Sequence, residues 1–249
     1  MKKEYHIGTS GWYYRHWRGR FYPEDIRIKD WFDYYCKHFN TVEINNSFYR
    51  WPDRDTIRKW YEQAPAGFKY TLKAPRTITH IKRFKDPEKY LHEFYSLTTG
   101  LVDRTGCYLF QAPPSFECNG RNLERIGTFL DHLDRKRENL VEFRHSSWWN
   151  DRVYRMFEEK GAVFCTVSGL SMKDDVVVTG DVAYFRFHGE SYSTSYTEDE
   201  ITGYAREMED LDCKCIYAYF NNDLNAYATQ NATELKNILE ENKDKHSTV

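Results

Sequence analysis

Polar side chains with catalytic chemistry end several short apolar segments of this chain. Residues 41–45 read TVEIN, residues 140–144 read LVEFR and residues 182–188 read VAYFRFH. In an extended strand, successive side chains point to opposite faces, so Glu43 and Glu142 lie opposite their apolar neighbours. Carboxylates, arginines and a histidine on such faces can transfer protons and bind anions. The pattern indicates a polar site assembled from several strands.

Four residues are candidates for catalysis: Glu43, Lys73, Glu142 and His188. A carboxylate beside cations stays ionised unless burial, or repulsion by another carboxylate, raises its pKa into the range of general acids and bases. His188 is suited to carry a proton near neutral pH, and the alternative is a structural histidine with satisfied hydrogen bonds. Lys73 is a candidate Schiff-base amine, a role that requires a lowered pKa.

The other candidates have the chemistry to bind a phosphate-bearing ligand. Arg144 and Arg186 suit paired hydrogen bonds to phosphate or carboxylate. Amide groups suit hydroxyls or base edges, and exposed rings suit stacking on a sugar or base, although such rings also serve loop packing. The predicted substrate-binding residues are Ser10, Trp12, Asn45, Tyr49, Gln111, Arg144, His145, Arg186, Asn221, Asn222 and Asp223.

A divalent metal site is an alternative use of the same residues. Such a site needs carboxylates and histidines that converge at one place. The available ligands are Glu43, His80, Glu142, His145, His188 and Asp223. Against a metal, Lys73, Arg144 and Arg186 share the same face and repel cations. No cofactor is firmly predicted, and the isolated motif Cys213-Lys-Cys215 does not define a metal site.

Short apolar strands alternate with helical segments along the whole chain. The expected strands are 5–9, 40–45, 68–73, 107–111, 140–144, 162–166, 182–188 and 215–220. The expected helices are 28–38, 54–64, 87–99, 121–135, 147–160, 197–210 and 224–241. Eight strands in this alternating pattern favour a closed (β/α)8 TIM barrel over an open doubly wound sheet. Residues 167–181 form an irregular unit without a clear helix.

Three local signals predict where helices begin or end. Asp86 followed by Pro87 is typical of an N-cap with proline in the first turn. Thr197 and Glu200 have the spacing of a capping box, in which each side chain bonds the backbone of the other residue. Gly161 stands where a helix that ends at Lys160 requires a left-handed residue.

The barrel makes a prediction about the direction of the side chains. Helices cover the outside, so outward residues must be apolar, whereas inward polar groups near the C-terminal strand ends indicate a site. The outward residues are Val42, Ile44, Tyr108, Phe110, Val141, Phe143, Phe185 and Phe187. The inward residues are Glu43, Asn45, Thr71, Lys73, Gln111, Glu142, Arg144, Arg186 and His188. Ion pairs that merely hold the barrel together are the alternative, but burying such pairs rarely adds net stability.

Length and composition set further limits. A chain of 249 residues with 40% hydrophobic and 17% aromatic residues suits one domain, expected over 1–241 with a polar tail at 242–249. No apolar stretch is long enough for a signal peptide or membrane span, and the six cysteines follow no disulfide or zinc pattern. We therefore expect a cytoplasmic protein with reduced thiols. Residues 1–85 carry 18 Lys and Arg against nine Asp and Glu, which suits phosphates.

Seven stretches, in order along the chain, resemble the YecE-like family, also called domain of unknown function 72. They are IGTSGWYYRHWRGRFYP (7–23), FNTVEINNSFYRWP (39–52), FKYTLKAPRTITH (68–80), LFQAPPSF (109–116), VEFRHSSWW (141–149), YFRFHG (184–189) and YAYFNND (217–223). The resemblance implies a TIM barrel with a pocket at the C-terminal strand ends, and it implies no particular reaction. A more distant analogy of fold links such barrels with endonuclease IV and xylose isomerase, whose sites hold divalent metals.

These observations together predict an enzyme of the hydrolase, lyase or isomerase class. It would use acid/base chemistry on a phosphate-bearing, sugar- or nucleotide-like substrate. Nucleic acid is the first specific substrate that the sequence suggests, and a small phosphosugar is the second. The competing prediction is a non-catalytic protein that binds nucleic acid or a metabolite in the same pocket. No membrane partner is expected, and the oligomeric state stays open.

Overall fold

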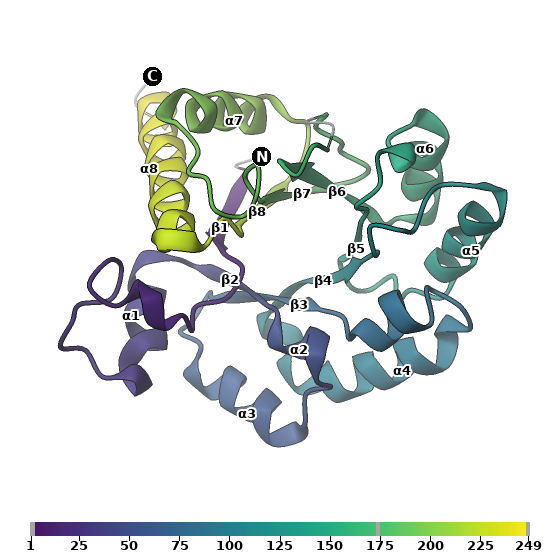
Figure 1. Cartoon of the computed structure of the whole chain (residues 1–249), viewed down its shortest axis with the longest axis horizontal. Coiled ribbons are helices and arrows are strands. Elements are labelled where there is room, and N and C mark those ends of the chain that lie inside the picture. Colours follow the sequence, from purple (N-terminus) through teal and green to yellow (C-terminus); the bar gives the residue numbers. More distant parts are fainter. Residues whose placement is uncertain (1–2, 173–174, 248–249) are drawn as a thin grey trace.

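Eight parallel strands form a nearly closed barrel that helices surround (Figure 1). The computed structural model describes residues 3–172 and 175–247. The strands are β1 (Glu4–Thr9), β2 (Thr41–Ile44), β3 (Lys69–Lys73), β4 (Thr105–Gln111), β5 (Asn139–Glu142), β6 (Val163–Ser168), β7 (Val182–Phe187) and β8 (Cys215–Phe220). They pair in the order β1-β8-β7-β6-β5-β4-β3-β2. The predicted (β/α)8 TIM barrel is confirmed, and each strand begins and ends within two residues of its expected position.

The junction between β1 and β2 closes the barrel. A single bridge between Ser10 and Glu43 joins the two strands at their C-terminal ends. Further down, the Tyr35 hydroxyl spans the junction, because it accepts a hydrogen bond from the Thr9 N–H and donates one to the Thr41 carbonyl, each at 3.0 Å. This closure sets Glu43 beside Ser10 at the C-terminal end of the barrel, which we call the mouth.

Helices cover the outside of the barrel (Figure 1). They are α1 (Trp31–His38), α2 (Asn46–Tyr49), α3 (Arg54–Gln63), α4 (Pro87–Thr98), α5 (Gly120–Asp131), α6 (Asp151–Lys160), α7 (Glu198–Asp210) and α8 (Tyr227–Ser247). The sequence did not predict α2, because a single turn carries no periodic pattern. Helix α8 extends six residues beyond its expected end at 241, into the segment expected as a tail, and residues 248–249 lie outside the described residues. None of the helices in 3–172 and 175–247 is both long and apolar enough to cross a membrane.

Two of the three predicted helix ends are confirmed. Thr197 and Glu200 form the capping box at the start of α7, and Gly161 ends α6 in a left-handed conformation with φ of 66°. Pro87 begins α4 as expected, but the Asp86 side chain makes no capping hydrogen bond. Asp86 has φ of 45°, and it therefore lacks the extended backbone from which a capping side chain bonds the first turn.

The connection between β6 and β7 contains no helix among its described residues. This connection covers residues 169–181, of which 173–174 lie outside the described residues. Here the side chain of Thr179 takes the place of a strand carbonyl as a hydrogen-bond acceptor for β6. Its hydroxyl accepts a hydrogen bond from the Phe164 N–H of β6 at 3.0 Å. The irregular unit predicted from the sequence is confirmed, except that β6 continues to Ser168 before the unit begins.

The outward strand faces are apolar, as predicted. Val42, Ile44, Phe110, Phe143 and Phe187 are each at most 1% exposed. Burying a side chain of this kind contributes about 1.5–3 kcal/mol. A slip of one residue would exchange the two faces of a strand, so this burial also fixes the inward direction of the polar residues.

Candidate active site at the mouth of the barrel

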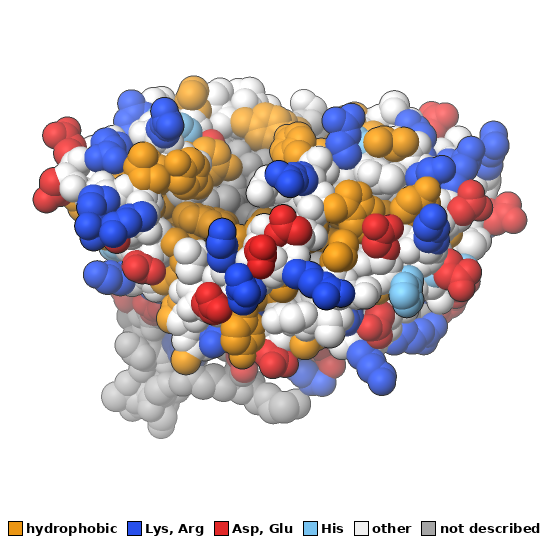
Figure 2. Space-filling view, turned by 90° about the horizontal axis from the view of Figure 1, so that it is seen from below, with side chains coloured by type: hydrophobic (Ala, Val, Ile, Leu, Met, Phe, Trp, Pro, Cys, Tyr) orange, Lys and Arg blue, Asp and Glu red, His pale blue; other side chains and the backbone are white. Residues whose placement is uncertain are grey.

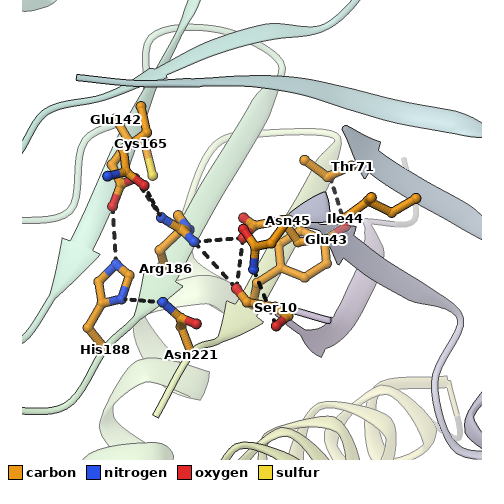
Figure 3. A network of polar contacts seen from close by, with 12 residues as sticks. Ser10, Glu43, Ile44, Asn45, Thr71, Glu142, Cys165, Arg186, His188 and Asn221 are labelled. Carbon is orange, nitrogen blue, oxygen red and sulfur yellow. Dashed lines mark hydrogen bonds and ion pairs between the residues drawn. The ribbon is translucent and has the colours of Figure 1, made fainter. Parts of the chain in front are cut away.

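Arg186 lies at the centre of a buried network at the mouth (Figure 3). Its Nη2 donates to Glu43 Oε1 on β2 at 2.6 Å, and its Nη1 donates to Glu142 Oε2 on β5 at 2.5 Å. All three side chains are 0% exposed. Burial opposes the charge of Arg186, but the carboxylates of Glu142 and Glu43 outweigh it and raise the pKa of the guanidinium above its ordinary value. One guanidinium therefore pairs with two carboxylates on strands that are far apart in the sequence.

Arg144 and His188 complete the hydrogen bonds of Glu142. Arg144 Nε donates to Glu142 Oε1 at 2.6 Å, and His188 Nε2 lies 3.1 Å from the same oxygen. Burial would raise the pKa of Glu142, but Arg144, Arg186 and the hydrogen bond with His188 hold it well below its ordinary value. Glu142 is therefore an ionised anchor for the network and is not poised as a general acid near neutral pH.

Both ring nitrogens of His188 have partners. Asn221 Nδ2 lies 3.1 Å from His188 Nδ1, and donation by this amide leaves the ring proton on Nε2. Nε2 lies 3.1 Å from both Glu142 Oε1 and Arg144 Nη2, and of these two only the carboxylate can accept the proton. Burial and the charge of Arg144 lower the pKa of His188 to about 3. In this arrangement His188 is neutral and positions Glu142, a role closer to the structural alternative than to a proton carrier.

Glu43 is held by a different set of donors. Besides Arg186, the Ser10 hydroxyl donates to Glu43 Oε1 at 2.8 Å and the Tyr184 hydroxyl donates to Oε2 at 2.9 Å. Asn45 lies next to Ser10, with its Nδ2 at 3.4 Å from the Ser10 carbonyl. The Oδ1 atom of Asn45 is buried and has no hydrogen-bond partner among the described residues. A buried acceptor without a donor is costly, and it indicates a place for a ligand group or a water.

Lys73 differs from every other charged group of the mouth. It ends β3 and is 9% exposed, but Nζ forms no hydrogen bond or ion pair with the residues that the structure describes. The amine lies over the ring of Phe48 on α2, with the ring centre 4.6 Å from Nζ. Burial and the charge of Arg186 lower the pKa of Lys73 to about 7, although Glu43 and Glu142 oppose this shift. The mouth thus contains one amine that titrates near neutral pH.

The carboxylates of the mouth do not fit a divalent metal site. All four oxygens of Glu43 and Glu142 already accept hydrogen bonds from protein donors. Among the described residues, one group brings metal-ligand atoms within 4.8 Å of one another. It consists of Glu4, His6 and Cys215, and it lies at the N-terminal ends of β1 and β8, opposite the mouth.

Two predicted binding residues after β8 serve the structure of the loops. Asn222 is 0% exposed and donates to the Thr194 carbonyl at 2.9 Å, which ties two loops together. Asp223 accepts a hydrogen bond from Trp17 Nε1 at 2.9 Å and also contacts His16. The contact of Asn222 fastens the loop after β7 to the segment after β8, and the contacts of Asp223 fasten the segment after β1 to it.

The remaining predicted residues lie at the edge of the network. Gln111 Oε1 is 3.5 Å from Arg186 Nη1, the limit of a hydrogen bond. His145 bonds Ser147 in the turn after β5, at 2.7 Å. Two aromatic candidates stay as rim residues: Trp12 packs on Phe32 with ring centres 4.9 Å apart, and Tyr49 is 74% exposed.

Three residues of the site were missed in the sequence. Tyr184 stands two positions before Arg186 on β7, so the alternation along the strand could have placed it on the inward face. Phe48 follows β2 in the unpredicted helix α2. Tyr192, whose hydroxyl accepts a hydrogen bond from Arg144 Nη1 at 2.8 Å, lies in a loop where no local pattern indicates a contact.

The similarity to known proteins covers nearly the whole chain. A family model described as "Protein of unknown function DUF72" matches residues 6–248. The chain belongs to this family. Among curated DUF72 relatives, UPF0759 protein YunF of Bacillus subtilis is 23% identical over 94% of each chain. UPF0759 protein YecE of Escherichia coli K12 is 32% identical, over 46% of this chain and 42% of YecE.

Solved structures agree with the DUF72 assignment. A DUF72 family protein from Thermotoga maritima is 29% identical and superposes with a TM-score of 0.88, over 95% of this chain and 99% of its own. A DUF72 family protein from Enterococcus faecalis, 18% identical, has a TM-score of 0.79 over 95% of each chain. A glycoside hydrolase family 5 enzyme from Prevotella bryantii shares the fold alone, at 11% identity and a TM-score of 0.53 over 95% of each chain.

Proposed function

We propose that the mouth is the active site of an enzyme in which the Lys73 amine transfers a proton to or from a phosphate-bearing, sugar- or nucleotide-like substrate. The unpartnered amine of Lys73 carries this proposal. Lysines with a lowered pKa serve as general bases and nucleophiles, because an appreciable fraction is deprotonated at neutral pH. The other charges at the mouth are already paired, so Lys73 is the group with free chemistry.

The surrounding groups suit an anionic substrate that bears hydroxyls. The Arg144 side chain is 8% exposed, but its Nη1 donates to the hydroxyl of the exposed Tyr192 at 2.8 Å, so it can bind a phosphate there together with protonated Lys73. Asn45 offers the unpartnered acceptor oxygen, which suits a substrate hydroxyl. In this arrangement Arg186, Glu43 and Glu142 are positioning residues that hold the cations around the substrate in place.

Lys73→Arg tests the proposed role, because arginine keeps the positive charge but does not release a proton near neutral pH. The wild type is first screened for a rise in melting temperature with sugar phosphates and nucleotides, and each stabilising ligand is assayed for turnover. We expect Lys73→Arg to lower turnover roughly 100-fold to 10,000-fold with binding retained. Lys89→Arg, at an exposed site on α4, is the matched control. Full turnover in Lys73→Arg would contradict the proposal.

A non-catalytic binding protein is the second candidate. The complete burial and pairing of Glu43 and Glu142 favour it, because neither carboxylate is free to act on a ligand. Under this proposal the same ligands raise the melting temperature, but none is converted by the wild type.

A further inference from the structure

A second polar site lies on the rim of the barrel, outside the network around Arg186. A pocket of about 560 Å³ opens between the loop that follows β3 and the loop that follows β4. These are βα loops, so the pocket lies on the same face of the barrel as the mouth. Five cationic side chains line it: Lys82, Arg83, Lys85, Arg121 and Arg125. We call this group the rim cluster.

The positive charges of the rim cluster are only partly offset within the described part of the chain. Asp86 and Glu117 also line the pocket, but neither forms an ion pair with the cluster at 4.0 Å or less. Burial and the charges of Arg121 and Arg83 lower the pKa of Arg125, which shows that like charges crowd there. Figure 2 shows positive and negative side chains interspersed over the face of the molecule that it draws. Like charges held together in this way stabilise a bound polyanion.

The loop after β3 holds these cations in a strained conformation. Arg83, Phe84 and Asp86 all have positive φ angles, of 50°, 63° and 45°. Each non-glycine residue in this region costs about 1 kcal/mol or more. Phe84 anchors the loop, because it is 1% exposed and packs against Phe116 with ring centres 5.3 Å apart. Such strain is retained where the surrounding structure fixes it, frequently at functional sites.

Two arginines of the rim cluster are also fixed in place. Arg83 donates to Ser115 Oγ at 3.1 Å and to the Ser115 carbonyl at 3.0 Å, and its guanidinium carbon lies 5.3 Å from the centre of the Phe116 ring. Arg125 lies 6.0 Å from the same ring and donates to the Arg83 carbonyl at 3.3 Å. Their positive charges are therefore pre-organised, which lowers the entropy lost when an anion binds.

His80 connects the rim cluster with the mouth. It lies on the turn of π-helix over Thr77–Ile81, and its ring packs on Phe48 at 4.9 Å, the ring that also contacts Lys73. Burial and the charges of Lys73, Arg76 and Arg83 lower the pKa of His80 to about 4. The charges of both the mouth and the rim cluster therefore act on the pKa of His80.

We infer that the rim cluster binds successive phosphates of a nucleic-acid strand whose neighbouring nucleotide occupies the mouth. Five Lys and Arg against Asp86 and Glu117 leave an excess of three positive charges around the pocket. A single phosphate group carries about two negative charges or fewer, whereas a strand supplies one negative charge per nucleotide. The exposed ring of Tyr49 after β2 offers a stacking surface on the same face. The link to the mouth rests on the proposed function, but binding at the rim is measurable without turnover.

Fluorescence anisotropy with a labelled 12-nucleotide single-stranded DNA, from 50 to 200 mM KCl, tests the inference. The variant Lys82→Gln/Lys85→Gln/Arg121→Gln removes three positive charges of the rim cluster. We expect binding at least about tenfold weaker than that of the wild type, with the slope of log K against log salt reduced by roughly 2. The matched control is Lys37→Gln/Arg135→Gln/Lys136→Gln, three exposed residues in segments that precede β2 and β5 at the opposite end of the barrel.

Equal binding by the rim variant and the control would overturn the inference. It would also be overturned if pyrophosphate raised the melting temperature of the wild type but not of the rim variant while the oligonucleotide bound neither protein. Lys73→Arg separates this inference from the proposed function. If it loses turnover while the rim variant binds normally, only the inference fails; if the rim variant loses binding while Lys73→Arg keeps turnover, only the proposed role of Lys73 fails.

Discussion

Arg186 donates through Nη2 to Glu43 Oε1 at 2.6 Å, and both side chains are completely buried. The same guanidinium also neutralises Glu142, so its loss leaves two carboxylates in the barrel without their shared cation. We expect Arg186→Met to lower the free energy of unfolding by roughly 3–5 kcal/mol. Urea unfolding measures the loss, and Arg206→Met, at an exposed site on α7, should stay within about 0.5 kcal/mol of the wild type. An equally small effect for Arg186→Met would contradict the central role of this residue.

Lys73 makes the stability of the protein depend on pH above neutrality. The fold lowers its pKa from 10.5 to about 7, so the unfolded chain binds more protons than the folded chain between these values. The contribution of Lys73 to the free energy of unfolding therefore rises with pH through this window. Lys73→Met removes the cost of burying an ammonium ion, and we expect it to stabilise the protein at pH 7 by roughly 2–4 kcal/mol.

Urea unfolding of the wild type and Lys73→Met at several values between pH 7 and 9.5 measures this difference. The advantage of Lys73→Met should shrink steadily as the pH rises. Lys89→Met, at an exposed site on α4, provides the control and should follow the wild type. A constant difference between Lys73→Met and the wild type would show that Lys73 does not titrate in this range.

His188 gives the protein a sensitivity to mild acid. Burial and the charge of Arg144 lower its pKa from 6.5 to about 3, so the unfolded chain takes up a proton that the folded chain excludes. Stability is therefore lost as the pH falls below 6.5, by about 1.4 kcal/mol per pH unit once the unfolded histidine is fully protonated. His188→Gln should flatten the curve between pH 6.5 and 5, measured by thermal unfolding. The same slope in both proteins would assign the acid sensitivity to other groups, such as His80.

Chelation of divalent metals should leave the mouth unchanged. The oxygens of Glu43 and Glu142 are occupied by protein donors, so no metal is needed to neutralise them. After dialysis against EDTA we expect the melting temperature, and binding of the 12-nucleotide DNA, to equal those of the untreated protein. A lower melting temperature that Mg²⁺ or Zn²⁺ restores would mean that a metal belongs to the folded state.

The sequence by itself determined the barrel and the face on which each strand carries its polar residues. Alternation with period two is local, and it assigned Val42 to the outside and Glu43 to the inside correctly. Eight strands, seven of them followed by a helical segment, then leave few other folds. Short features without a period, such as α2 and the left-handed Asp86, carried no such signal.

Only the tertiary structure decided which of the inward groups are paired. The position of Arg186 between Glu43 and Glu142 depends on distances across the barrel between strands far apart in the sequence. Lys73 was recognised as a candidate from its place on a strand, but its lack of a partner follows from where the other cations lie. Pairing and burial set the charge state of each group, and both arise only when the barrel closes.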